Sequence, residues 1–378
     1  MKKVLIAHQS TIPHYRVPFY NALQKCKPNH WQFDVVFDPT ELDNKIFFKE
    51  ELDSNLFNFP ILAVQTFSAK IGNTNVCYQT FWKKAAKYDL IVVEQALNNL
   101  AYPLCSLYKF KGTKLIYWGH GKHRKLQNPS FFRSLLEQTK MILTRQANAF
   151  FAYTPLVKHF MIEKGFSPDK VFVLNNTIDI NAQREAFEQL KEQRNEIRKS
   201  LGIANKKVLL FVGRFSKTKR IELLLEAFSI IQKKDDNFHL LLVGSGGDDY
   251  SLENLPNVSY FGPITDLDKL APIYVAADLF SFPGSVGLGP IQALCYDLPI
   301  ITIDSQIHPP EIEYLLPTNS LILPSDTTSE DYAQSIIELF SDSDKLNNLK
   351  TNAWSTIKHL TIEQMAQNFA SGINTILN

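Results

Sequence analysis

Short apolar segments alternate with longer amphipathic segments along the whole chain. In the first half, the apolar segments are rich in β-branched and aromatic residues, and they predict strands at 4–7, 33–37, 90–94, 114–118, 149–153 and 170–174. Near-continuous apolar strands are typical of parallel sheets that are covered on both faces. The pattern therefore predicts an α/β fold.

The second half repeats this rhythm, with predicted strands at 207–213, 239–244, 258–262, 278–282 and 299–303. A polar, charge-rich stretch from 181 to 206 joins the halves. We therefore expect two Rossmann-like, doubly wound parallel-sheet domains facing across a cleft, at 1–180 and 181–360. The final segment, 361–378, is expected to be a helix, and the pattern leaves open which domain it covers. Ligands of such folds bind outside the carboxyl ends of the strands.

Composition narrows the possible functions. A chain of 378 residues suggests two domains, and its net charge of +2 makes any polyanion site a local feature. No motif for nucleic acid accompanies the basic segments. The four cysteines are scattered without a CxxC pair, which indicates reduced thiols in a cytoplasmic protein. No apolar run approaches the roughly 20 residues of a membrane-spanning helix, and the start of the chain is interpreted as a strand and not a signal peptide.

Four cations stand between a predicted strand and the helix that follows it: Arg214, Lys217, Lys219 and Arg220. The helix dipole disfavours cations at this end of a helix, whereas free backbone N–H groups there favour anions. The segment is therefore a candidate phosphate clamp. A solvated cluster of surface charge is the alternative interpretation.

The segment V-G-R-F-x-x-x-K-R-x-E-x-L-L-E-A-F at 212–228 resembles the signature of the GT4 family of retaining glycosyltransferases, glycosyl transferases group 1 with the GT-B fold. The resemblance extends in order over the second half, and in strand rhythm over the first. It implies that Arg214 and Lys219 are catalytic residues that grip the diphosphate of a nucleotide sugar. It also implies that the leaving phosphate helps to take the acceptor's proton.

The loop at 284–292 departs from that family, because Gly284 and Gln292 stand where relatives carry glutamates. Its glycines let a ligand approach the backbone, and the amide of Gln292 can still bond ribose hydroxyls. The expected donor-binding residues are Gly213, Gly284, Ser285, Val286, Gly287, Leu288 and Gln292. The alternative is a plain Gly-Pro turn before a buried helix.

The first half offers further candidates at strand ends. His120 follows the strand at 114–118, and the resemblance implies that it contacts the donor sugar and takes part in catalysis. A structural or solvated histidine is the alternative. His14, Tyr15, Arg16 and Lys122 are candidates for contacting the acceptor, and the alternative for them is an ordinary surface loop.

Residues 109–145 contain nine Lys or Arg and one acid, Glu137, interleaved with aromatic and aliphatic residues. The part from 130 to 145 predicts a basic amphipathic helix that binds an anionic membrane surface, or else the charged face of an ordinary helix. No metal site is expected. The D-x-D spacing of Asp266 and Asp268 is better explained as the acidic start of a helix capped by Thr265.

These features predict a glycosyltransferase that moves a sugar, with retention, from a UDP- or GDP-type donor to a glycan or lipid-linked glycan. The expected role is bacterial surface polysaccharide assembly. The donor is a co-substrate, and no cofactor is expected. We expect a cytoplasmic protein, either free or on the inner face of the cytoplasmic membrane. The alternatives are a sugar-nucleotide epimerase of the same fold and a catalytically silent binding subunit.

Overall fold

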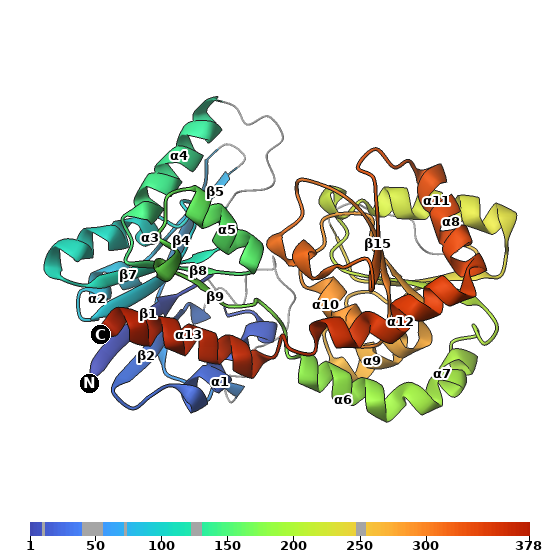
Figure 1. The fold of residues 1–378 in the computed structure, drawn as a ribbon, viewed down its shortest axis with the longest axis horizontal. Coiled ribbons are helices and arrows are strands. Elements are labelled where there is room, and N and C mark those ends of the chain that lie inside the picture. Colours follow the sequence, from blue (N-terminus) through green and yellow to red (C-terminus); the bar gives the residue numbers. More distant parts are fainter. Residues whose placement is uncertain (10–11, 40–55, 72–73, 122–130, 247–254) are drawn as a thin grey trace. The chain divides into compact units, whose positions relative to one another are not determined.

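The computed structural model describes residues 1–9, 12–39, 56–71, 74–121, 131–246 and 255–378. The chain forms two compact units (Figure 1). Unit 1 consists of Met1–Asn176 together with Ile362–Asn378, and unit 2 of Thr177–Thr361. The sequence placed the boundaries at 180 and 361.

Unit 1 is built on a parallel sheet of seven strands in the order β3-β2-β1-β6-β7-β8-β9. Its strands are β1 (Lys2–Ala7), β2 (Trp31–Phe37), β3 (Ile61–Ala63), β6 (Leu90–Glu94), β7 (Lys114–Gly119), β8 (Ala149–Ala152) and β9 (Val171–Val173). The inner strands are almost wholly buried, because their side chains meet helices on both faces. A separate antiparallel hairpin, β4 (Thr66–Ile71) and β5 (Thr74–Gln79), follows β3.

The described helices of unit 1 are α1 (Val17–Cys26), α2 (Phe81–Ala85), α3 (Ala101–Leu104), α4 (Phe131–Arg145), α5 (Pro155–Glu163) and α13 (Ile362–Leu377). Helix α13 comes from the far end of the chain and packs against α1 (Figure 1). Phe369 lies 5.4 Å from the rings of both Phe19 and Trp118. A Cβ on Gly372 would lie only 2.4 Å from the Phe151 ring, so the helix sits directly on β8. The last segment of the chain thus belongs to the core of unit 1.

Unit 2 has a parallel sheet of six strands in the order β12-β11-β10-β13-β14-β15. The strands are β10 (Lys207–Val212), β11 (Phe238–Val243), β12 (Val258–Tyr260), β13 (Leu279–Ser281), β14 (Ile300–Ile303) and β15 (Ser320–Leu323). The first strand of the unit thus lies beside the fourth. Strand order reverses at this point, and doubly wound folds bind their ligands at such a position.

Helices surround the second sheet: α6 (Ile180–Leu190), α7 (Arg194–Ser200), α8 (Ile221–Lys234), α9 (Leu267–Ala276), α10 (Gly289–Leu294), α11 (Ser329–Ser341) and α12 (Ser343–Ile357). Their starts follow from local chemistry. For example, Thr328 and Asp331 form a capping box at α11. Helices α8 and α11 pack together, and α6 and α7 both pack on α9.

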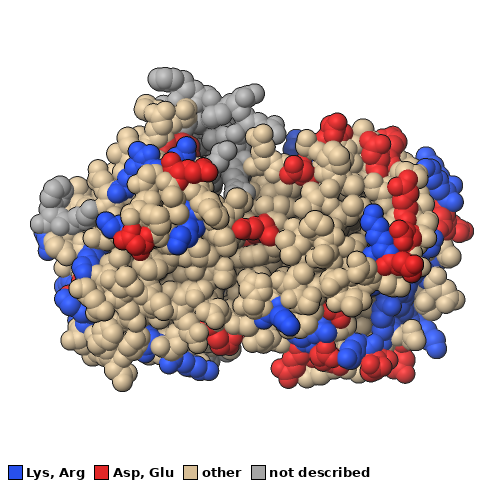
Figure 2. Space-filling view, viewed as in Figure 1, with Lys and Arg blue, Asp and Glu red and all other residues tan. Residues whose placement is uncertain are grey.

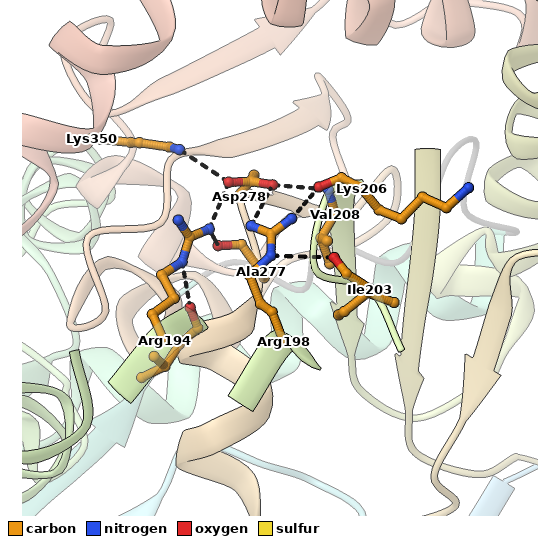
Figure 3. A network of polar contacts seen from close by, with 9 residues as sticks. Arg194, Arg198, Ile203, Lys206, Val208, Ala277, Asp278 and Lys350 are labelled. Carbon is orange, nitrogen blue, oxygen red and sulfur yellow. Dashed lines mark hydrogen bonds and ion pairs between the residues drawn. The ribbon is translucent and has the colours of Figure 1, made fainter. Parts of the chain in front are cut away.

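A largely buried aspartate, with its side chain 13% exposed, fastens the amino-terminal end of the second sheet (Figure 3). Asp278, just before β13, accepts a hydrogen bond from the backbone N–H of Val208 at 2.9 Å. Its carboxylate also pairs with Arg194 at 2.7 Å, Arg198 at 3.3 Å and Lys350 at 3.4 Å. These cations, the nearest charges, hold its pKa below the usual range although burial acts in the opposite direction. The cluster ties α7 and α12 to β10 and β13.

All eleven strands predicted from the sequence are present, within a residue or two at each end. Strands β3 and β15 and the β4–β5 hairpin were not predicted, because their segments are short and weakly apolar. All four cysteines are free thiols. Among the described residues, no helix is long and apolar enough to cross a membrane. Acidic and basic side chains are interspersed over the face of each unit that Figure 2 shows.

Candidate functional site

The loops that follow β10 and β13 meet at the carboxyl edge of the second sheet. The backbone N–H of Gly213 donates to the Val243 carbonyl at 3.0 Å, which holds the start of the first loop against β11. A Cβ on Gly213 would lie 3.1 Å from the ring of Phe282, the residue after β13. Glycine therefore lets the two loops approach each other.

The basic segment forms a tight turn and then a helix. Lys217–Lys219 is a single 3₁₀ turn, and Arg220 adopts a left-handed conformation with φ of 53° at the start of α8. Arg214 and Lys217 are exposed, whereas Lys219 is half-buried. Two of the four cations thus face solvent beside the helix start, as the phosphate-clamp hypothesis requires.

The ammonium group of Lys219 is held by the second loop. Its Nζ donates to the carbonyl oxygens of Ser285 and, at 3.1 Å, of Val286. The same group lies 5.0 Å from the centre of the Phe282 ring, a cation–π distance. Lys219 therefore carries positive charge to the junction of the two loops and also shapes the second one.

Gly284 is buried against the backbone of this lysine. A Cβ built on Gly284 would lie 2.4 Å from the carbonyl carbon of Lys219 and 2.5 Å from its Cα and oxygen. The next residue, Ser285, donates its backbone N–H to the Thr218 carbonyl at 2.8 Å. A glutamate at position 284 would not fit this arrangement. The missing carboxylate is thus explained by close packing of the two loops.

A buried histidine fixes the second loop from its other side. The Nδ1 atom of His308 accepts the backbone N–H of Val286 at 3.2 Å, and its Nε2 faces the Ile303 carbonyl at 2.8 Å. An imidazole that accepts at Nδ1 carries its proton on Nε2, so these partners select one neutral tautomer. His308 is therefore a positioning residue for the loop.

The remaining residues of this loop differ in their surroundings. Gly287 has φ of 83°, where a side chain would be strained, and its Cβ position faces open space. Leu288 is the residue before α10. Gln292 does not point at the loop junction: its amide nitrogen donates to Oε1 of Gln183 on α6 at 3.1 Å. The structure thus gives Gln292 a packing role between two helices of unit 2.

A third loop, after β11, completes this edge and was not predicted from the sequence. A Cβ on Gly244 would lie 1.9 Å from the Gly213 oxygen, and one on Gly246 would lie 1.8 Å from the Phe215 oxygen. Both positions therefore exclude side chains. The signal that could have indicated it is V-G-S-G-G directly after a buried strand.

His120 lies at the carboxyl edge of the first sheet, just after β7. It is exposed, and its ring lies 4.2 Å from that of Tyr153. The hydroxyl of Tyr153 bonds Nε2 of the buried His8 at 3.0 Å, and His8 stacks on Trp118 at 3.8 Å. Burial, and then the charges of Arg16 and His120, lower the pKa of His8 well below its usual value, so its ring is neutral at physiological pH.

The residues after β1 that were predicted to contact the acceptor differ in their exposure to solvent. His14 is exposed and Tyr15 half-buried, with their rings 5.8 Å apart. Arg16 is only 1% exposed: its Nη2 donates to Asn176 Oδ1 at 2.9 Å, and its guanidinium lies 5.3 Å from the Trp118 ring. Arg16 therefore contacts the interior of unit 1 in this structure. Lys122 lies outside the described residues.

Two residues at this edge were missed by the sequence analysis, His8 and Glu94. Each follows or ends a strand at the point where strand order reverses in the first sheet. The sequence analysis predicted both β1 and β6, so the position of these two residues at the strand ends could have indicated them as site candidates.

The D-x-D pair has a structural role. Asp266 caps α9, its side chain accepting the backbone N–H of Asp268 at 3.0 Å. The sequence analysis had named Thr265 as the cap. The structure shows that Asp266 is the cap instead, because its carboxylate accepts a free backbone N–H group at the helix start. Among the described residues, no cluster of three or more His, Cys, Asp or Glu could hold a metal ion.

Helix α4 exposes apolar residues, with Leu135 48% and Ile142 55% exposed. The two cations of this helix whose side chains are described, Lys140 and Arg145, do not form a simple basic face beside them. Lys140 is buried and pairs with Glu137 at 2.7 Å, and Nε of Arg145 donates to the Lys164 carbonyl at 2.5 Å. The rest of the basic stretch includes 122–130, which lie outside the described residues.

Comparisons with known proteins agree with this geometry. Residues 193–356 match the family model described as glycosyl transferases group 1. An uncharacterized 41.2 kDa protein in the cps region of Klebsiella pneumoniae is 24% identical over 225 residues, which cover 58% of this chain and 61% of that protein. An uncharacterized glycosyltransferase of Methanocaldococcus jannaschii is 24% identical over 287 residues, which cover 72% of this chain and 71% of that protein.

A solved structure is similar over the whole chain. Anabaena Alr3699/HepE, in complex with UDP-glucose, superposes with a TM-score of 0.68 at 17% identity, covering 99% of this chain and 100% of that one. Two parallel-sheet, Rossmann-like units of this kind are the GT-B fold. Together the findings support a glycosyltransferase whose second unit contains the group 1 match.

Proposed function

We propose that the protein transfers a sugar, with retention of anomeric configuration, from a nucleoside diphosphate sugar to a glycan or lipid-linked glycan. The observation that carries this proposal is the glycine-lined loop junction of unit 2, where Lys219 contacts the loop that contains Gly284. Backbone N–H groups and cations bind the negative charge of a diphosphate. The junction also lies where strand order reverses, which is the usual position of a ligand site in this kind of fold. The similarity to a structure in complex with UDP-glucose favours a UDP-type donor, with a GDP-type donor as the alternative.

Arg214 and Lys219 have separable roles in this proposal. The exposed guanidinium of Arg214 binds the diphosphate and stabilises the charge that develops as the sugar departs. Lys219 adds a second positive charge and, through the Ser285 and Val286 carbonyls, positions the loop. The exposed His120 of unit 1 is proposed to contact the donor sugar. The departing phosphate receives the acceptor's proton.

A role in bacterial surface polysaccharide assembly also belongs to the proposal. It is supported by the similarity to a protein in the cps region of Klebsiella pneumoniae. The acceptor would then be a growing glycan, free or linked to a lipid. Binding to an anionic membrane through 109–145 stays a prediction.

The test combines donor binding with turnover. The donors are UDP-glucose, UDP-galactose, UDP-N-acetylglucosamine and GDP-mannose, each with para-nitrophenyl glycosides of glucose, galactose, mannose and N-acetylglucosamine as acceptors. A donor that binds raises the melting temperature. With the donor and acceptor that give transfer, Arg214→Ala should lower kcat/KM at least a hundredfold. Loss of one contact to the charge that develops on the departing diphosphate in the transition state has an effect of about this size.

Lys233→Ala is the matched control, because it removes a positive charge from an exposed position in the last turn of α8, away from the loop junction. It should change kcat/KM less than threefold. Equal effects of the two substitutions would contradict a specific diphosphate contact at Arg214. Incubation with donor alone separates the epimerase alternative: an isomeric nucleotide sugar, and no transfer to any acceptor, would refute the proposal.

A further inference from the structure

Glu94 is the last residue of β6 and stands where strand order reverses in the first sheet. Strand β6 pairs with β1 on one side and with β7 on the other, and Glu94 is in register with Trp118. The carboxylate thus occupies, in unit 1, the position at which doubly wound folds bind their ligands.

The carboxylate has unused hydrogen-bonding capacity. The backbone N–H of Gln9, a residue with φ of 70°, donates to it. No salt bridge between described residues involves Glu94, although the side chain is partly exposed. Burial raises its pKa despite the bond from Gln9. A carboxylate has about four acceptor positions, so several remain for a ligand.

The surroundings suit a neutral polar ligand. Trp118, Tyr20 and the neutral imidazole of His8 are buried in this part of the unit. Tyr20 is close enough to Glu94 for the charge of that carboxylate to add to burial in raising the tyrosine's pKa. Three buried donor or acceptor atoms here have no hydrogen-bond partner among the described residues: Nδ1 of His8, Nε1 of Trp118 and the Tyr20 hydroxyl. Such atoms indicate a site that water or a ligand completes.

We propose that Glu94 binds a hydroxyl group of the acceptor sugar through its carboxylate. The inference rests on the proposed function, in which the donor diphosphate binds the loops of unit 2. An uncompensated carboxylate repels phosphate and accepts strong hydrogen bonds from hydroxyls. Glu94 therefore selects the sugar part of the acceptor and not a phosphate-containing part.

The test compares Glu94→Gln with wild type in the donor and acceptor pair found active above. Glutamine keeps the shape but loses the charge-assisted bond, so the acceptor KM should rise about tenfold. The donor KM, the donor-induced rise in melting temperature and the slow hydrolysis of donor without acceptor should stay within twofold of wild type. Glu163→Gln, an exposed position on α5, is the matched control and should change none of these.

Two results would overturn the inference. One is an unchanged acceptor KM in Glu94→Gln. The other is a parallel loss of donor binding, hydrolysis and thermal stability, which would assign Glu94 a structural role beside Gln9. Failure of the proposed function looks different, because wild type itself would then transfer no sugar in any pair.

Discussion

Gly284 provides a sharp test of how the second unit is packed. Replacing it with alanine adds one methyl group, whose carbon would lie 2.4 Å from the carbonyl carbon of Lys219. Real Cβ contacts essentially never fall below 3.0 Å, so the two backbones must separate by at least 0.6 Å. The neighbouring bond from the Ser285 N–H to the Thr218 carbonyl, now 2.8 Å, would lengthen toward the limit of a hydrogen bond.

Overpacking of this kind typically costs about 1–3 kcal/mol of unfolding free energy. A loss of 1 kcal/mol lowers the melting temperature by about 2–4 °C in a domain of this size. Gly284→Ala should therefore melt about 2–12 °C below wild type in calorimetry, within the transition of unit 2. Its urea midpoint should fall in parallel, and Gly284→Glu, which adds a longer side chain, should be at least as unstable.

Gly289→Ala is the matched control, because its Cβ would make an ordinary contact, 3.7 Å from the Phe280 ring, at the start of α10. It should be as stable as wild type. A Gly284→Ala variant that melts at the wild-type temperature would refute this reasoning, because the close approach to Lys219 would then not affect stability. A glutamate at 284 that strengthened donor binding would likewise refute it.

Other predictions concern stability, pH and membranes. Asp278→Asn should lower the unfolding free energy by about 3–5 kcal/mol in urea titration, since it leaves the buried guanidinium of Arg198 without its anion; a wild-type midpoint would contradict this. Burial, with a smaller contribution from a nearby lysine, lowers the pKa of His239 to about 4, so the unfolded chain binds the proton more readily. The free energy of unfolding should therefore fall as the pH drops from about 6.5 to 4, by up to about 1.4 kcal/mol per pH unit. His239→Gln should reduce this pH dependence, whereas substitution of the exposed His359 with glutamine should not. Membrane binding through 109–145 predicts co-sedimentation with phosphatidylglycerol vesicles that weakens with salt; equal pelleting with phosphatidylcholine vesicles would refute it.

The sequence alone was sufficient for the fold class, for eleven of the strands and for the location of the basic segment. Buried parallel strands are nearly continuous apolar runs, and amphipathic helices repeat with their own period, so both are readable from local pattern. The basic segment at 213–220 was likewise placed between a strand and a helix start, where the structure has it. These features can be predicted from local pattern because the residues that determine each of them are neighbours in the sequence.

Tertiary structure decided how the side chains at those strand ends are used. Gly284 excludes a glutamate because the Lys219 backbone lies against it, and Lys219 bonds to Ser285, 66 positions along the chain. Gln292 turns to α6, and Arg16 is buried beside α13, the last helix of the chain. Periodicity indicates which face of an element is buried but not which distant segment meets it. The pattern could therefore locate the loops of the site, whereas only the packed chain determined which of their side chains remain available to a ligand.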